Sequence, residues 1–255
     1  MQDAAGAGFR LFDTATAYGN RAETGEGLRR FGREQCYLVS KVWHDKQAPD
    51  KLRADLEETL QEVNSSYLDA YLLHWPNSAE PIEGTLGALD GAKREGRVRH
   101  IGICNVTVHH LNRLFEVGIP IDWVQVEVNP LFVDRELLVL CQQNHIGVMG
   151  WAPLARGALA KDALLTEIGE AHDKSAAQVA LRWCIDQGCM PIAKARKPEH
   201  IRANLDLNFT LSDEEMARLN AHPSQRSRER ITPEYGFDFS DEFDFSPDQC
   251  WPCSS

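Results

Sequence analysis

The sequence predicts a parallel (β/α)8 barrel, the TIM-barrel fold class, from three observations. Short apolar runs rich in β-forming residues alternate with longer amphipathic stretches along most of the 255-residue chain. Most runs lie one βα unit apart, which is roughly 30 residues. Polar side chains stand where the runs end, and in a parallel barrel those ends meet at the rim that holds the active site. An open doubly wound sheet would gather fewer of them.

Seven segments are expected to form strands, because each is short and enriched in β-branched or aromatic residues. They are Phe9–Asp13, Tyr37–Lys41, Ala70–His74, His100–Cys104, Trp123–Glu127, Gly147–Trp151 and Met190–Ala193. A closed barrel of this class has eight strands, so one strand is not readable in this chain.

Amphipathic patterns between and after these strands predict five helices. They are Lys51–Val63, Gly84–Arg94, Val108–Val117, Ser175–Gln187 and Ser212–Asn220. In the first helix, Leu52, Leu56 and Leu60 share an apolar face, and Asp55 is assigned to the polar remainder.

Terminal residues support the bounds of three helices. Gly118 stops the third helix, and Asp173 or Ser175 can cap the fourth. Ser212 opens the fifth helix with the pattern of a capping box. Because no linker or change of composition interrupts the series, residues 1–255 are expected to form one domain.

Composition and charge narrow the partners and the compartment. The formal net charge is −11, which argues against nucleic acid as a partner. No apolar run approaches the roughly 20 residues of a membrane span, and the first residues do not form a secretory signal. The seven cysteines are odd in number and mostly scattered, which is typical of a reduced, cytoplasmic protein. Cys250 and Cys253 have CxxC spacing but lack the context of a redox or zinc site, so no metal is expected.

Four residues near the predicted strand ends point to one kind of chemistry. A lysine at position 41 would be largely desolvated and would need a carboxylate such as Asp13 beside it. Tyr18 is a weak acid, and a nearby ammonium would ease release of its proton. His74 could then hold a carbonyl oxygen, so the set suits reduction of a carbonyl with hydride from a cofactor. The alternative is a structural ion pair with an unrelated tyrosine nearby.

A basic segment supports a phosphate-bearing cofactor. It begins after the last predicted strand, where barrel enzymes often bind phosphate. Asn105, Gln125 and Trp151 would add two amides and a flat aromatic face that suit a nicotinamide ring. The alternative for the basic segment is a solvated surface. Its charged residues are Lys194, Arg196, Lys197, His200 and Arg202.

The chemical motifs, taken in order, resemble those of the aldo-keto reductase family, in a style similar to its bacterial 2,5-diketo-D-gluconate reductase branch. No Rossmann glycine pattern, P-loop, esterase elbow or zincin motif competes with this assignment. The resemblance covers residues 8 to about 220 of the chain. The matching segments are Gly8–Asn20, Ser40–Trp43, Leu72–Pro76, Ile101–Asn105, Gln125–Pro130, Trp151–Gly157 and Lys194–Asn204.

The resemblance implies that the protein reduces aldehydes or ketones with NADPH. It makes Tyr18 the general acid, and Lys41, paired with Asp13, the group that lowers its pKa. His74 would orient the carbonyl of a small-molecule substrate. The substrate-binding residues would be His74, Trp43, Trp75 and a C-terminal loop or tail over residues 221–255. The cofactor-binding residues would be Asn105, Gln125, Trp151, Leu154, Lys194, Ala195, Arg196, His200 and Asn204.

Departures from the family pattern affect the cofactor positions most. His200 takes the place of the usual arginine, and Ala195 that of a serine or threonine near the 2′-phosphate. Because arginine binds phosphate bidentately and histidine is mostly neutral at pH 7, the preference for NADPH should weaken and NADH should also be accepted, unless Arg196 compensates. Cys104 replaces a serine and Trp151 a tyrosine beside the nicotinamide position.

The start of the chain departs most from the family pattern. The family's hairpin, first strand and most of its first helix would precede Gly8, so the first strand is expected to be the missing one. The chain would then be N-terminally truncated, with unpaired strand edges near Asp13 and Lys194. A truncated, non-catalytic cofactor-binding or interaction module is the alternative function. A full-length protein would be a monomer.

Overall fold

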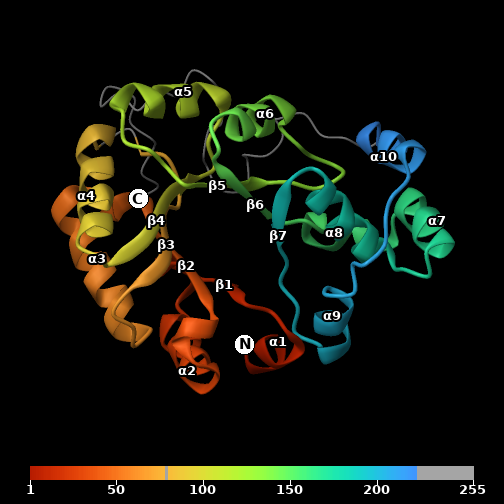
Figure 1. Cartoon of the computed structure of the whole chain (residues 1–255), viewed down its shortest axis with the longest axis horizontal. Coiled ribbons are helices and arrows are strands. Elements are labelled where there is room, and N and C mark those ends of the chain that lie inside the picture. The colour runs from red at the N-terminus through yellow and green to blue at the C-terminus, as the bar shows by residue number, and fades with distance from the viewer. Residues whose placement is uncertain (78–79, 223–255) are drawn as a thin grey trace, which may run out of the picture.

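Seven parallel strands form a nearly closed barrel in the computed structural model, which describes residues 1–77 and 80–222 (Figure 1). The strands pair in chain order, each parallel to the next, and the two ends of this order, β1 and β7, are not paired with each other within the described ranges. The predicted fold class and strand count are confirmed. The strands are β1 (Leu11–Asp13), β2 (Tyr37–Val42), β3 (Leu68–Leu73), β4 (Val98–Cys104), β5 (Trp123–Glu127), β6 (Gly147–Trp151) and β7 (Cys189–Ile192).

Helices surround the ring of strands, and α1 packs beside α9 next to the ends formed by β1 and β7 (Figure 1). The α-helices are α1 (Gln2–Ala7), α2 (Arg21–Phe31), α3 (Pro49–Glu62), α4 (Ile82–Arg94), α5 (Val108–Val117), α6 (Arg135–Gln143), α7 (Ala163–Ala171), α8 (Ala176–Asp186), α9 (Pro198–Ala203) and α10 (Asp213–Asn220). Short 3-10 helices are η1 (Thr16–Tyr18), η2 (Arg33–Gln35), η3 (His44–Lys46) and η4 (Ala155–Lys161).

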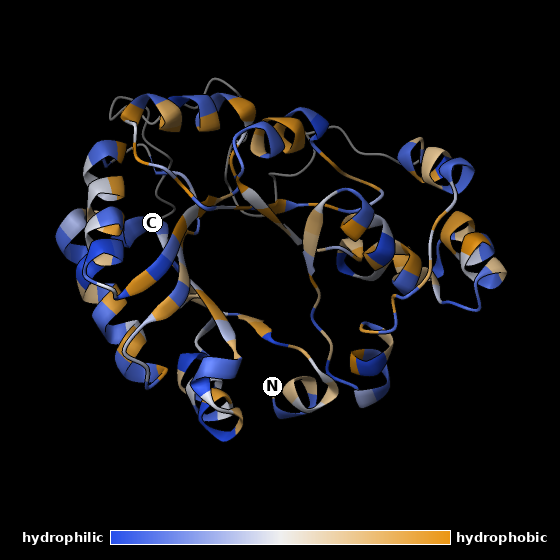
Figure 2. Ribbon diagram, viewed as in Figure 1, coloured by the Kyte–Doolittle hydropathy of each residue, from blue (hydrophilic) through white to orange (hydrophobic). Residues whose placement is uncertain are grey.

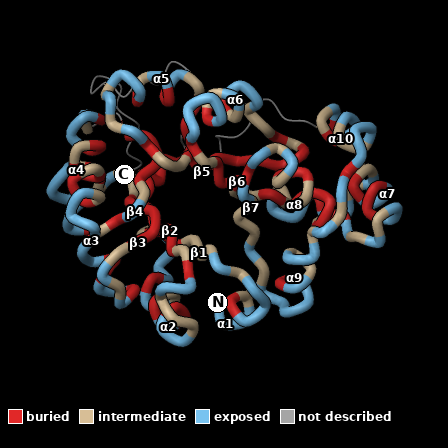
Figure 3. The backbone as a smooth tube through the Cα atoms, viewed as in Figure 1, coloured by how far each residue is buried: buried red, intermediate tan, exposed pale blue. Residues whose placement is uncertain are grey.

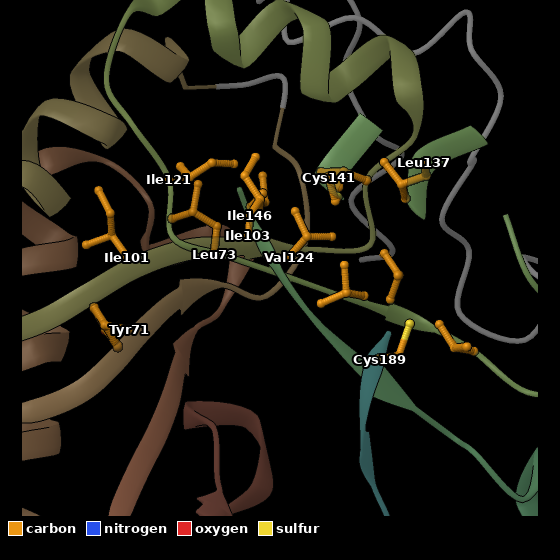
Figure 4. Packing of buried hydrophobic residues seen from close by; sticks show 14 of the residues in the cluster. Tyr71, Leu73, Ile101, Ile103, Ile121, Val124, Leu137, Cys141, Ile146 and Cys189 are labelled. Carbon is orange, nitrogen blue, oxygen red and sulfur yellow. The ribbon is translucent and has the colours of Figure 1, made fainter. Parts of the chain in front are cut away.

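Apolar side chains pack in two layers because successive strand residues point to opposite faces. The outer layer lies between strands and helices, and Ile103, Val124 and the α6 residues Leu137 and Cys141 belong to it (Figure 4). Figure 2 shows the helices turning hydrophilic residues outward. The smaller inner layer fills the barrel beneath the polar rim, so that the rim rests on a packed floor. Its buried members are Val39, Ala70, Leu72, Cys104 and Met149.

Local capping signals act as the sequence predicts. Ser175 and Ser212 each accept a hydrogen bond from the backbone N–H three residues on, and both form capping boxes. Gly118 ends α5 with a left-handed backbone, φ 74°. These interactions satisfy backbone groups that a helix end otherwise leaves without partners.

Two expectations about helices were wrong or incomplete. Asp55 of α3 is buried rather than on the polar face, because residues three and four apart share one side of a helix, and Leu52 and Thr59 place it inward. The helices α1, α2, α6, α7 and α9 were not among the five predicted. In α2, glycines lower the helix propensity. One of them is needed for packing, since a Cβ on Gly25 would lie 2.6 Å from the Cα of Val63.

The proposed substrate tail and the Cys250–Cys253 pair lie outside the described residues, except for the first two positions of the tail. Among the helices that the structure describes, none combines the length and apolar character that crossing a membrane requires.

Candidate active site

The four predicted catalytic residues meet at the carboxyl ends of the first three strands. Asp13 ends β1, Lys41 lies in β2, and His74 follows β3 directly. Tyr18 closes the single turn η1 that follows β1. Parallel pairing brings these ends together, because strands in register finish at the same edge of the sheet.

The Lys41 ammonium is the centre of the group. Its side chain is 0 % exposed, and Nζ lies 2.5 Å from Asp13 Oδ1 and 3.3 Å from the Tyr18 hydroxyl. It also donates to the backbone oxygen of Thr14 at 3.0 Å. Burial lowers the pKa of Lys41, but Asp13, Tyr18 and Cys104 together outweigh burial and raise it overall. Lys41 is therefore charged at neutral pH.

Tyr18 retains its proton at neutral pH. Desolvation raises the pKa of its hydroxyl more than the Lys41 ammonium lowers it, and Asp13 raises it further. The residue is nevertheless 49 % exposed, so a molecule arriving from solvent can reach it. The site thus presents a protonated phenol, accessible from outside and backed by a buried positive charge.

His74 is a neutral hydrogen-bonding group. Burial, the Lys41 ammonium and His44 lower its pKa to about 3. Its ring stands edge-on to Tyr18 at 5.6 Å and to Trp43 at 5.0 Å between ring centroids. Its buried Nδ1 has no hydrogen-bond partner within the described residues. A buried polar atom without a partner is unusual and suits a ligand.

The residues expected to hold a nicotinamide are joined to this group. Asn105 donates to the backbone oxygen of His74 and accepts from the Trp151 indole, each at 2.9 Å. Asn105 has the left-handed φ of 59° that asparagine tolerates. Gln125 donates to Asp13 Oδ2 at 2.8 Å, while its Oε1 is approached by the Cys104 thiol at 3.9 Å. Because a thiol is a weak donor, this oxygen keeps capacity for a ligand amide.

The segment expected to hold the cofactor phosphate lies apart from these contacts, after β7. Lys194, Arg196 and His200 are exposed, and in the part of the chain that the structure describes they form no ion pair. Ala195 and Asn204 are half-buried. Exposed cations on one segment, together with two amides and an aromatic ring at the rim, are chemically suited to a phosphate-bearing nicotinamide dinucleotide, so the residue types present fit that cofactor.

The remaining predicted residues occupy varied environments. Trp43 is half-buried against His74, and Trp75 is buried. Leu154 is half-buried and packs against the outer apolar layer. Sequence reasoning missed His44, whose ring lies 5.0 Å from that of Trp43 and which helps keep His74 neutral. Its position three residues after Lys41, in the loop that follows β2, was the available signal.

Comparison with known proteins identifies the family of this chain. The sequence profile of the Aldo/keto reductase family matches residues 1–223. The chain belongs to the aldo/keto reductase family. The resemblance seen in the motifs is thereby confirmed.

Three relatives illustrate the range of this aldo/keto reductase family. The glyoxal reductase of Bacillus subtilis (strain 168) is 37 % identical over 218 residues, which cover 84 % of this chain and 79 % of the relative. A protein assigned as 2,5-diketo-D-gluconic acid reductase B has a crystal structure similar with a TM-score of 0.84 and 35 % identity, covering 91 % of this chain and 83 % of that one. The aldo-keto reductase of Bombyx mori in complex with NADP has a TM-score of 0.81 and 30 % identity, covering 86 % and 80 %.

Proposed function

We propose that this aldo/keto reductase is an NADPH-dependent enzyme that reduces the carbonyl group of a small aldehyde or ketone. The observation that carries the proposal is the contact of Lys41 Nζ with both Asp13, at 2.5 Å, and the Tyr18 hydroxyl, at 3.3 Å. It supplies a proton donor and a buried charge at one point, and carbonyl reduction needs both.

Tyr18 acts as the general acid. As charge develops on the carbonyl oxygen, the phenolic O–H bond breaks and its proton passes to that oxygen, leaving a phenolate on Tyr18. The Lys41 ammonium stabilises this phenolate, and in a water-poor site such stabilisation is strong. Asp13 keeps Lys41 charged and fixes its direction.

His74 orients the substrate. A neutral imidazole can donate a hydrogen bond to the carbonyl oxygen without competing with Tyr18 as the proton source, and the low pKa of His74 supports that role. Trp43, which stands against the His74 ring, and Trp75 would form apolar walls beside the carbonyl.

The cofactor-binding residues divide into two groups. When bound, the nicotinamide supplies the hydride. Asn105 and Gln125 would bind its carboxamide, and Trp151 would lie against its ring, with Leu154 nearby in sequence. The segment from Lys194 to Asn204, with Ala195, Arg196 and His200, would bind the 2′-phosphate and adenine. Because His200 and Ala195 bind a phosphate weakly, NADH would also be accepted. The NADP complex of the Bombyx mori relative supports this class of cofactor.

The remaining expectations concern the cell rather than the reaction. The five cysteines that the structure describes are all free thiols, which supports a reducing, cytoplasmic location. A monomer without nucleic-acid partners stays a prediction.

Tyr18→Phe tests the proposed function. With NADPH and glyoxal, the substrate in the name of the Bacillus relative, the variant should lose at least about 100-fold in kcat, because general acid catalysis typically contributes that much. Cofactor affinity, measured by quenching of tryptophan fluorescence, should not change. Retained turnover would refute the role of Tyr18.

Tyr37→Phe is the matched control. Tyr37 begins β2, at the opposite end of that strand from the rim, where its hydroxyl accepts from the Trp123 indole at 2.9 Å. Its loss should leave kcat unchanged. If the wild-type chain binds NADPH but turns over no aldehyde, the non-catalytic alternative is the correct one.

A further inference from the structure

A second buried carboxylate lies behind the catalytic group and takes no part in the proposed reaction. The side chain of Asp55, on the inward face of α3, is 0 % exposed. An isolated carboxylate in such a place would be very costly, so its surroundings must compensate for it.

Among the residues that the structure describes, every side-chain partner of Asp55 donates to it. Oδ2 accepts from the Thr16 hydroxyl and from the Tyr71 hydroxyl, both at 2.7 Å. Oδ1 accepts from Lys46 Nζ at 2.9 Å and faces Arg21 Nη1 at 3.6 Å. Four donors from four different elements therefore hold both oxygens of the Asp55 side chain in one place.

One of these donors belongs to the turn that carries Tyr18. Thr16 begins η1 and Tyr18 ends it, and this turn has no side-chain cap. The Thr16 hydroxyl lies between Asp55 Oδ2 and the backbone oxygen of Lys41, at 2.7 and 3.0 Å. The turn is thus fastened to Lys41 itself, the residue whose ammonium must meet the Tyr18 hydroxyl.

Tyr18 needs this support because it is half exposed. Its described side-chain contacts are the Lys41 ammonium at 3.3 Å and the edge of the His74 ring. The phenol is therefore half open to solvent, and its position depends on that of the turn. A displacement of about 1 Å at a reacting group can reduce a rate by about 100-fold.

We propose that Asp55 is a positioning residue for Tyr18: through its bond with the Thr16 hydroxyl it fixes the η1 turn so that the phenol meets Lys41 and the substrate. The inference rests on the proposed function, because it needs Tyr18 to be the proton donor. Asp55 itself touches neither substrate nor cofactor.

Thr16→Val tests the bond with the least disturbance. The substitution keeps the shape of the side chain, removes only the hydroxyl, and leaves Asp55 with Tyr71, Lys46 and Arg21. Assayed with NADPH and glyoxal, the variant should lose about tenfold in kcat, with the KM for glyoxal and the affinity for NADPH unchanged. Thr16→Ser, which restores the hydroxyl, should recover most of the loss. If the Thr16 hydroxyl had a purely structural role, its loss would lower the melting temperature without lowering kcat selectively over KM and NADPH affinity.

The matched control is Thr166→Val in α7, which removes an exposed hydroxyl that donates to the backbone oxygen of Asp162, the residue before the helix. It should leave kcat as in the wild type. Asp55→Asn provides a second test, since an amide turns an NH2 toward two of the four donors. If Asp55 and Thr16 act through one hydrogen bond, the double variant that combines Thr16→Val with Asp55→Asn loses no more kcat than Asp55→Asn alone.

The possible failures are distinguishable. If Tyr18→Phe is inactive but Thr16→Val and Thr16→Ser both have wild-type kcat, the inference is wrong and the proposed function stands. If Tyr18→Phe keeps its turnover, the proposed function itself fails. Should Asp55→Asn not fold, Thr16→Val still tests whether the Thr16 hydroxyl, which contacts both Asp55 and the backbone oxygen of Lys41, positions Tyr18.

Discussion

The rim of the first three strands and the segment after β7 differ in how their functional side chains are held. At the rim, Lys41 is fully buried and bonded to Asp13 and Tyr18. After β7, Arg196 and His200 are exposed and make no ion pair in the described parts of the chain. Figure 3 shows the same contrast, with β2 to β5 mostly buried and α9 mostly exposed.

This difference matches the tasks that we propose for the two regions. Proton transfer needs fixed distances between the donor and the acceptor. The entropic cost of fixing them is lowest when the folded protein has already ordered these groups. Binding a phosphate needs charges that solvent keeps available until the ligand arrives. The side chains of the rim are therefore ordered before the ligand binds, whereas the cations of the basic segment form ion pairs only with the phosphate of the bound ligand.

The strongest test of the contrast is Lys41→Met. It removes the ammonium but keeps an unbranched side chain, so the Tyr18 phenolate is no longer stabilised. We expect kcat to fall by at least about 100-fold with little change in the affinity for NADPH. The free energy of unfolding should also fall by about 3 kcal/mol or more, because Asp13 is left buried without its cation. Steady-state kinetics, a cofactor titration and urea unfolding measure the three quantities. A comparable loss of cofactor affinity would show that the regions are not separate.

The second prediction concerns the loss of stability at acidic pH that His74 at the rim causes. The pKa of His74 is about 3 in the folded protein and about 6.5 in an unfolded chain. Below pH 6.5 the unfolded chain therefore binds a proton that the folded protein does not. Stability is then lost as the pH falls from 6.5 toward 3, by about 1.4 kcal/mol per pH unit.

Urea unfolding of the wild type and of His74→Gln at pH 7 and pH 5 isolates this contribution. Titration of the other residues is common to both proteins and cancels in the comparison. Between the two pH values the wild type should lose about 2 kcal/mol more than the variant. Equal losses would mean that folding does not lower the pKa of His74.

The smallest expected effect concerns the basic segment. Arg196→Ala should weaken NADPH binding by about three- to tenfold, because it removes one exposed charge from the phosphate site. NADH binding and kcat should not change, since NADH lacks the 2′-phosphate. Fluorescence titrations with both cofactors measure the change, with Arg29→Ala on the exposed face of α2 as the control. A large preference for NADPH that survives Arg196→Ala would contradict the expected weak selectivity.

Much of the fold was predictable because local patterns repeat along this chain. The expected strand bounds differ from the observed ones by about two residues at most, and three helix ends follow from their caps. Asp13, Lys41 and His74 were predictable because each stands at the end of an apolar run. The helix α2 was not predictable, because Gly25 lowers helix propensity. The reason for a glycine there is the close approach of Val63, which lies in another segment.

The sequence by itself determined the barrel class, the family and the four catalytic candidates, because these depend on spacing along the chain. Only the tertiary structure revealed that Asp55 is buried beneath Thr16 and that the Trp151 indole bonds to Asn105. Such contacts join residues from separate βα units. Whether a charged or polar side chain is buried depends on partners that no local pattern contains, since burial is stable only where the folded chain supplies the matching donors.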